Sequence, residues 1–239
     1  MHFVDAKGIL TGSGGRYGMN IYRGCTHGCI YCDGRSRCYQ FAHPFEDVEV
    51  KQNAPELLEA ALRSKRKPCM ISTGSMSDPY MHCEETLRLT RRCLEIILRY
   101  GFGAVVLTKS DRVLRDINLL DEINRASKCV VQMTLTTVDE ELCRIVEPNV
   151  CTTKRRIEVL EALLRRVQYS VRGAGIPEER HEFTFVRARQ RISVSVALNI
   201  ALLQPREVSV KCGVIIFPVP VAQRQPHAEA DDALDARPD

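Results

Sequence analysis

The chain has 239 residues and a formal net charge of +4, and it is 44% hydrophobic and 27% charged. These values are typical of a globular protein and allow one large α/β domain with a buried core. They give no sign of a membrane protein, because no apolar run approaches a membrane-spanning length, nor of a secretory leader. Eleven cysteines, an odd number, argue against a disulfide framework, so we expect a reduced, cytoplasmic protein.

The mild positive charge does not by itself indicate a nucleic-acid surface. Basic residues cluster at 63–67, 91–92 and 154–156. We expect these clusters to be solvated helix faces or helix C-termini, where cations are favoured.

The first part of the chain leads into a loop with three cysteines. Residues 1–16 contain Thr11-Gly-Ser-Gly-Gly15 and are expected to form a flexible leader. This run does not predict a phosphate loop, because no Lys-Ser or Lys-Thr pair follows it. Residues 17–23 predict a short strand, and the loop after it carries the cysteines Cys25, Cys29 and Cys32.

The C-x3-C-x2-C spacing of these cysteines indicates a loop around a compact inorganic centre. Gly24 and Gly28 keep the segment open. Three cysteines can hold a 4Fe-4S cluster and leave one iron free for a further ligand, whereas a structural zinc site takes four protein ligands. The alternative is a zinc knuckle with Cys38 as the fourth ligand. The sequence favours the iron–sulfur cluster.

Beyond an irregular segment at 33–50, strands and helices alternate. Short apolar runs predict buried strands at 69–72, 103–108 and 129–137. Amphipathic helices are predicted from Asn53, at 84–99, from Asp111, from Asp139 and from Thr153, with Asn53 and Asp111 as N-caps and Gly101 as a C-terminal glycine. This alternation, with nearly continuous apolar strands, indicates an α/β fold with a parallel sheet buried on both faces.

Polar residues gather at the carboxyl ends of the predicted strands, where parallel sheets place their sites. Gly74, Ser75 and Ser77 follow the second strand, Lys109 follows the third, and Thr134 lies late in the fourth. Because the cysteine loop follows the first strand, we expect all four strand ends to meet at one cofactor site. Each residue also has an ordinary interpretation, as a turn, a surface lysine or a β-branched strand residue.

Several motifs together resemble the radical S-adenosylmethionine (SAM) proteins related to spore photoproduct lyase. The resemblance covers roughly residues 7–166 and is carried by Asn20-Ile-Tyr-Arg-Gly-Cys-Thr-His-Gly-Cys-Ile-Tyr-Cys32, Ser77-Asp-Pro79, Thr108-Lys109 and Glu147-Pro148. It implies a partial parallel (β/α)6 barrel and a 4Fe-4S cluster on Cys25, Cys29 and Cys32. It also implies SAM contacts from Tyr31, Ser77, Lys109 and Thr134.

The activity that the resemblance implies is lyase-like. A low-potential electron donor of the flavodoxin or ferredoxin type would reduce the cluster, and SAM would be cleaved to methionine and a 5′-deoxyadenosyl radical. The repair lyase has a cysteine close before the serine that matches Ser77. Here the nearest candidate is Ser75, a far poorer hydrogen-atom donor. We therefore expect a paralogue that acts on another substrate.

The C-terminal part departs from the family pattern. Beyond Leu164 the alternation is lost and arginine becomes frequent. We expect a barrel domain at 1–166, a divergent or frame-shifted segment at 167–220 with strands or a hairpin at 192–203 and 208–217, and a disordered tail at 221–239. The barrel would then be incomplete at its C-terminus.

Three functions follow from the sequence. The first is a radical SAM enzyme. The second is a non-catalytic iron–sulfur or zinc protein that kept the loop but lost the rest of the site. The third is a DNA-binding module inherited from the repair-lyase relationship, whose sign would be salt-dependent binding. Production of 5′-deoxyadenosine from SAM distinguishes the first from the second.

Overall fold

The computed structural model describes residues 1–173, 182–187, 190–197 and 213–216, with side chains described as far as Arg166. Its centre is a sheet with the strand order β10-β9-β11-β8-β7-β6-β3-β2. Four neighbouring strands run parallel: β3 (Arg16–Met19), β6 (Met70–Thr73), β7 (Gly103–Thr108) and β8 (Cys129–Leu135). The predicted parallel α/β sheet and its last three strands are therefore confirmed.

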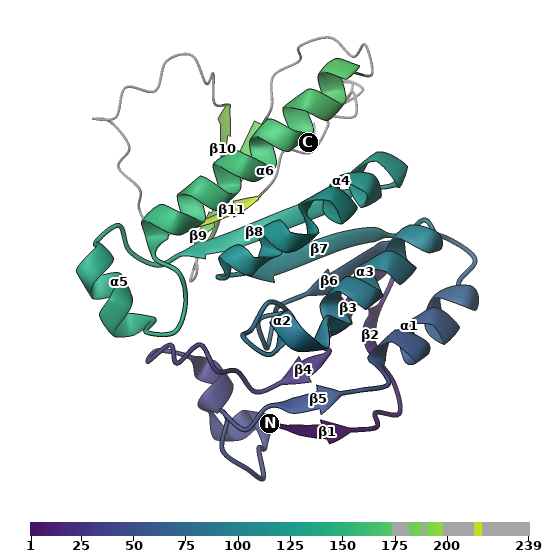
Figure 1. Ribbon diagram of the computed structural model, residues 1–239, viewed down its shortest axis with the longest axis horizontal. Helices are drawn as coiled ribbons and strands as arrows, with labels where there is room; N and C mark the ends of the chain where they lie inside the picture. The colour runs from purple at the N-terminus through teal and green to yellow at the C-terminus, as the bar shows by residue number, and fades with distance from the viewer. Residues whose placement is uncertain (174–181, 188–189, 198–212, 217–239) are drawn as a thin grey trace, which may run out of the picture.

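The helices cover one face of this sheet. Figure 1 shows α1 (Ala54–Arg63), α3 (Leu89–Arg99), α4 (Ile117–Ala126) and α6 (Thr153–Gly173) side by side in front of the strands. Residues that point toward the helices are buried, such as Val106 and Met133. Their strand neighbours Leu107, Gln132 and Thr134 are only half-buried. The second face of the sheet is thus less buried than predicted. The described strands form an open sheet, which agrees with the predicted partial barrel.

Two predicted helices are interrupted. The helix predicted at 84–99 is divided into α2 (Glu84–Leu87) and α3 by Arg88, whose φ is 51°. The buried Glu84 carboxylate accepts hydrogen bonds from the backbone of Thr90 and Arg91 across this break. The helix predicted from Asp111 begins as a 3-10 helix (Asp111–Asp116) before α4.

The predicted helix ends are only partly confirmed. Ser110, not Asp111, caps the 3-10 helix through its side chain. Asn53 makes no capping bond, because its side chain binds the backbone of Ala6 instead. Asp139 does cap α5 (Glu140–Val146), and Gly101 ends α3 with a φ of 70°.

The leader is structured, contrary to the expectation of a flexible stretch. β2 (Leu10–Ser13) pairs with β3 as an antiparallel hairpin, whose turn at Gly14 and Gly15 has positive φ. β1 (His2–Val4) pairs with β5 (Glu49–Lys51), which also pairs with β4 (Tyr22–Arg23). The single strand predicted at 17–23 is therefore two strands in two sheets.

The C-terminal strands extend the sheet in the antiparallel sense. β11 (Gly213–Ile216) pairs with β8, β9 (Glu182–Arg187) pairs with β11, and β10 (Gln190–Ala197) pairs with β9. The strands predicted at 192–203 and 208–217 overlap β10 and β11, whereas β9 was not predicted. The predicted tail at 221–239 lies outside the described residues. The division at residue 166 and the frame-shift hypothesis stay predictions.

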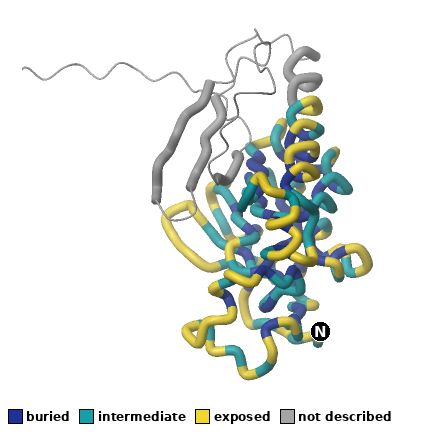
Figure 2. The backbone as a smooth tube through the Cα atoms, turned by 90° about the vertical axis from the view of Figure 1, so that its left-hand side faces the viewer, coloured by how far each residue is buried: buried dark blue, intermediate teal, exposed yellow. Residues whose placement is uncertain are grey.

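One hydrophobic core joins the helices to the sheet. Figure 2 shows the buried backbone gathered in the interior and the exposed turns at its edge. Cys93 and Cys129 belong to this core and behave as small hydrophobic residues. Cys143 is buried as well, but its thiol contacts the polar side chains of Glu147 and Thr153. No helix in the described part of the chain is long and apolar enough to cross a membrane.

Candidate metal and cofactor site

The cysteine loop leaves β4 and is held against the segment before β5. Gly24 has a φ of 94°, and a Cβ on it would lie 2.4 Å from the carbonyl oxygen of Phe45. The backbone N–H of Cys25 donates to that same oxygen at 3.1 Å. Only glycine fits this close approach, so the sequence Gly24-Cys25 fixes where the loop begins.

The three loop cysteines differ in burial, and their thiols do not form a compact group. Cys29 is buried, and Cys25 and Cys32 are half-buried. Zinc thiolates lie roughly 3.8 Å apart, given Zn–S bonds of about 2.3 Å. Within the described residues, these three thiols, with or without Cys38, form no group whose ligand atoms all lie within 4.8 Å of one another. The iron–sulfur cluster on Cys25, Cys29 and Cys32 stays a prediction.

Cys38, the fourth ligand of the alternative zinc site, lies outside the loop. It is exposed on a 3-10 turn, where its Sγ lies 2.8 Å from Ser36 Oγ. In the loop, burial raises the pKa of the Cys25 thiol to about 11 and raises that of Cys29 as well. Iron would have to displace these protons, since metals bind the thiolate.

Lys109 reaches the cysteine loop from the end of β7. Its Nζ lies 2.6 Å from the hydroxyl oxygen of Tyr31, 3.6 Å from Cys29 Sγ and 3.0 Å from a carboxylate oxygen of Glu147. Two of the predicted cofactor residues, Tyr31 and Lys109, are thus brought together beside a predicted cluster ligand. Burial would lower the pKa of Lys109, but Glu147, Cys29 and Tyr31 raise it above its usual range, so the ammonium is charged.

Glu147 is the buried centre of this network, and no role was predicted for it. One oxygen, Oε1, also accepts from Tyr31 and from the Thr136 hydroxyl at 2.6 Å, while Oε2 lies 2.6 Å from the guanidinium of Arg156. Burial would raise its pKa, but the cations Lys109 and Arg156 hold the pKa at about 2. The Glu147-Pro148 motif was the sequence signal that could have identified it.

A second carboxylate, Asp78, joins the ends of β6 and β7 to the cysteine loop. It accepts hydrogen bonds from the Thr108 hydroxyl and the Lys109 N–H, both at 2.7 Å, and lies 3.5 Å from His27 Nδ1. Its neighbour Ser77 is buried, and the Ser77 hydroxyl has no hydrogen-bond partner in the described part of the chain. A buried hydroxyl without a partner is unusual, and the role of Ser77 as a SAM contact stays a prediction.

The other predicted cofactor residues, Gly74, Ser75 and Thr134, lie at or just after the ends of β6 and β8. Gly74 has a φ of 97°, and a Cβ on it would lie 1.9 Å from the carbonyl oxygen of Leu107, so this loop lies directly on β7. Ser75 is exposed on the same loop. Thr134 is half-buried on the open face of β8, where its carbonyl oxygen accepts from Arg156 at 2.9 Å.

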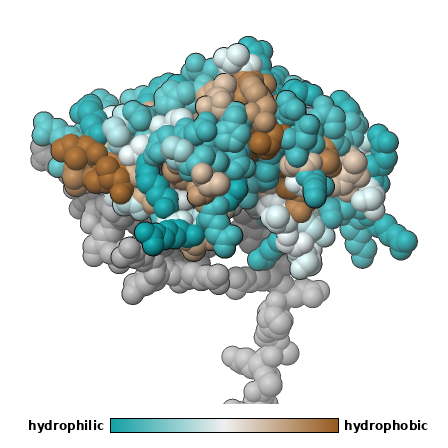
Figure 3. Space-filling view, turned by 90° about the horizontal axis from the view of Figure 1, so that it is seen from below, coloured by the Kyte–Doolittle hydropathy of each residue, from teal (hydrophilic) through white to brown (hydrophobic). Residues whose placement is uncertain are grey.

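An apolar surface flanks the site. Ile30 in the cysteine loop is 67% exposed, and its N–H donates to the carbonyl of Val146 at the end of α5. Leu142 and Ile145 of α5 are exposed as well. Figure 3 shows a hydrophobic patch on the left, the side on which α5 lies in Figure 1. The cysteine loop therefore lies at the surface beside exposed apolar residues.

Comparison with known proteins gives relatives in archaea, bacteria and a virus. An uncharacterized protein of Methanocaldococcus jannaschii is 33% identical over 152 residues, covering 63% of this chain and 56% of that protein. An uncharacterized protein of Mycobacterium tuberculosis is 32% identical over 155 residues, covering 62% of this chain and 45% of that protein. An uncharacterized protein of Acidianus two-tailed virus is 25% identical over 168 residues, covering 66% of this chain and 54% of that protein. The chain spans about half the length of these relatives.

A solved structure and a family model were also matched. A spore photoproduct lyase variant with bound AdoMet and dinucleoside spore photoproduct aligns with a TM-score of 0.43 and 17% identity, covering 67% of this chain and 43% of that one. The model of the Radical SAM superfamily matches residues 19–184. Because this match includes the cysteine loop and more than half of the chain, the chain belongs to the radical SAM superfamily.

Proposed function

We propose that the chain is a radical SAM enzyme in which Cys25, Cys29 and Cys32 hold a 4Fe-4S cluster. The observation that carries this proposal is the contact of Lys109 with Tyr31 and Cys29, because it brings a half-buried cation from another strand end to the cysteine loop. Such a reduced cluster, when bound with SAM, supplies the electron that cleaves SAM to methionine and a 5′-deoxyadenosyl radical.

The chain's own residues would bind and orient SAM. Lys109 offers an ammonium for the carboxylate of SAM, and it is held in place by Glu147. Ser77 offers a buried hydroxyl without a partner in the described structure, and backbone groups near Gly74 can meet the amino group. Thr134, half-buried on the open face of β8, is the contact that we propose for the rest of the cofactor.

The finer assignments rest on the motif resemblance to the spore photoproduct lyase family. We infer a lyase-like reaction on a substrate other than the photoproduct, and a low-potential electron donor of the flavodoxin or ferredoxin type. A cytoplasmic location is supported by the free thiols of the described cysteines. DNA binding stays a proposal from the same resemblance.

One observation favours a second candidate, a cluster-binding protein that does not cleave SAM. The sheet continues from β8 into the antiparallel strand β11, where the family implies a further parallel strand. If the adenine end of SAM depends on that parallel strand, the chain would bind a cluster but position SAM poorly.

Iron content tests the cluster assignment. After anaerobic reconstitution with iron and sulfide, we expect about four irons per chain. Replacing Cys25, Cys29 or Cys32 by Ser should abolish cluster assembly, and Cys38→Ser is the matched control that should leave it unchanged. An equal loss in the Cys38 variant, with zinc bound in preference to iron, would support the zinc knuckle instead.

A further inference from the structure

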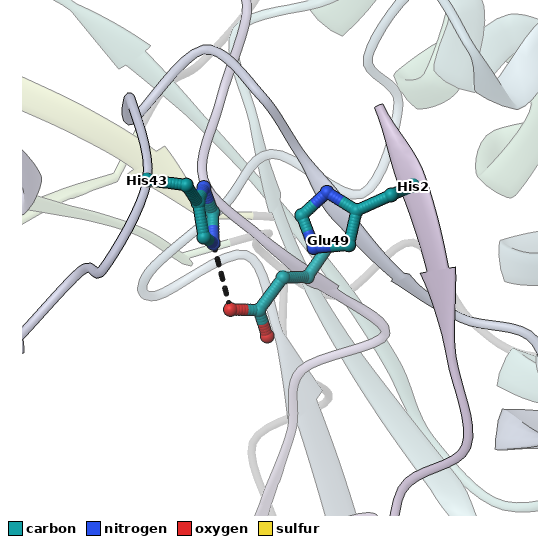
Figure 4. Close-up of side chains that lie close together, drawn as sticks. All are labelled: His2, His43 and Glu49. Carbon is teal, nitrogen blue, oxygen red and sulfur yellow. Dashed lines mark hydrogen bonds and ion pairs between the residues drawn. The ribbon is translucent and has the colours of Figure 1, made fainter.

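Three side chains that bind metals in many proteins meet away from the cysteine loop, on the small sheet β1-β5-β4. His2 lies on β1, Glu49 on β5 and His43 on the segment before β5. One ligand atom of each lies within 4.8 Å of the others. Figure 4 shows the His43 ring and the Glu49 carboxylate directed at each other, with the His2 ring beside them. The strand register pairs His2 with Glu49, so backbone pairing positions two of the three.

The outer hydrogen bonds of the two histidines use only Nδ1 of each ring. Nδ1 of His2 lies 3.1 Å from a carboxylate oxygen of Asp47, and Nδ1 of His43 lies 2.9 Å from the carbonyl oxygen of Pro44. Because both partners accept, each ring carries a proton on Nδ1 and keeps Nε2 for another bond. A carboxylate or a carbonyl behind each imidazole is the arrangement that orients histidines at metal sites.

His43 and Glu49 need a cation between them or a second proton on the ring. Nε2 of His43 lies 2.8 Å from Oε1 of Glu49, and both atoms are acceptors when the ring is neutral. Arg23 also donates to this oxygen, at 3.0 Å, so it orients the carboxylate and competes for it. The side chains of His43 and Glu49 are 19% and 17% exposed, which leaves them within reach of solvent ions.

We propose that His2, His43 and Glu49 form a zinc site, distinct from the cysteine loop, with Asp47 and Pro44 as its outer hydrogen-bond partners. Two imidazole nitrogens and one carboxylate oxygen form a donor set that suits Zn²⁺, with a water completing four-coordination. This role is structural. The metal joins β1, the segment before β5, and β5 itself.

The same elements support the cysteine loop. Glu49 pairs with Arg23 of β4, two residues before Cys25, and the N–H of Cys25 is bound to Phe45 in the segment that carries His43. Zinc at this position therefore steadies the base of the loop without contacting the cluster.

Histidine ring resonances test the site in the full chain. In the ¹⁵N-labelled protein, Zn²⁺ is titrated in a chelator buffer and the ring nitrogens are followed, with assignments from His2→Gln and His43→Gln. These resonances report this site even if the loop thiols also take up zinc. We expect about one equivalent of Zn²⁺ to shift both rings, while His82, which packs near His27, stays unmoved.

Matched carboxylate variants make the test specific. Glu49→Gln should weaken zinc binding at these rings by more than tenfold, and Asp47→Asn by about 10–100-fold. Glu46→Gln is the control, because Glu46 pairs with Arg35 and should not change the affinity. If zinc leaves both rings unmoved, or if Glu49→Gln binds zinc as well as Glu46→Gln does, the proposal is overturned.

Discussion

Replacement of Glu147 by Gln should destabilise the fold by a large and calculable amount. The Glu147 and Arg156 side chains are both fully buried and lie 2.6 Å apart, and Lys109 lies 3.0 Å from the same carboxylate. The Glu147 carboxyl has a pKa of about 2 instead of the usual 4.5. That difference corresponds to a stabilisation of about 3 kcal/mol. Breaking one side of a buried ion pair costs a similar amount, about 3–5 kcal/mol.

The assay is urea unfolding at neutral pH, followed by circular dichroism, on protein without added iron. This condition removes the stabilisation that a bound cofactor adds. We expect Glu147→Gln to lower the free energy of unfolding by about 3 kcal/mol. Glu158→Gln is the control, because Glu158 pairs with Arg155 at the surface at 3.1 Å and should cost about 1 kcal/mol or less. If the two variants lose equal stability, Glu147 is not the buried charge centre described here.

Three further predictions concern the same region. Below pH 4.5 the difference in the free energy of unfolding between the native chain and Glu147→Gln should narrow in urea unfolding. The pKa of Glu147 is lower in the folded than in the unfolded state, so its stabilisation is fully present only above the unfolded pKa and is lost as pH falls toward 2. Gly74→Ala should prevent normal folding in the same assay, because its Cβ would lie 1.9 Å from the Leu107 carbonyl oxygen. Gly101→Ala is the control: Gly101 also has a positive φ but lies in open space, so this variant should lower the free energy of unfolding by only about 1–2 kcal/mol. Lys109→Met should weaken SAM binding roughly 10–100-fold in equilibrium dialysis of cluster-loaded protein, and unchanged affinity would remove Lys109 from the site.

The strands nearest the site were predictable because their signals are local. β6, β7 and β8 are short apolar runs, and each ends in polar residues, so both their position and their convergence followed from the sequence. The contacts of Lys109 and Thr136 with Tyr31, and of Thr108 with Asp78, bring the ends of these strands to the cysteine loop. The role of this place as a cofactor site stays a prediction. The cysteine spacing likewise identified the loop without knowledge of the fold.

The buried charges were not predictable, because their environment is set by tertiary packing. Arg156 belongs to a basic cluster that we expected to be solvated, yet it is fully buried on α6. Its partner Glu147 comes from the turn after α5. The sequence does not show that Arg156 is buried while its neighbour Arg155 is exposed. Helix periodicity contains no information about the Glu147 carboxylate that pairs with Arg156 in the interior.

The small sheet was missed for a related reason. β1 and β5 pair across more than forty residues, and each is only three residues long. Strands this short carry no periodic signal, so only the folded chain brings His2 to Glu49.

Production of 5′-deoxyadenosine is the most direct test of the proposed function. The anaerobically reconstituted protein is incubated with dithionite and SAM, and 5′-deoxyadenosine is quantified together with iron. We predict SAM cleavage that depends on dithionite and is absent from Cys29→Ser. Full cluster content, about four irons per chain, without any 5′-deoxyadenosine would contradict the account and indicate a cluster-binding protein that does not cleave SAM.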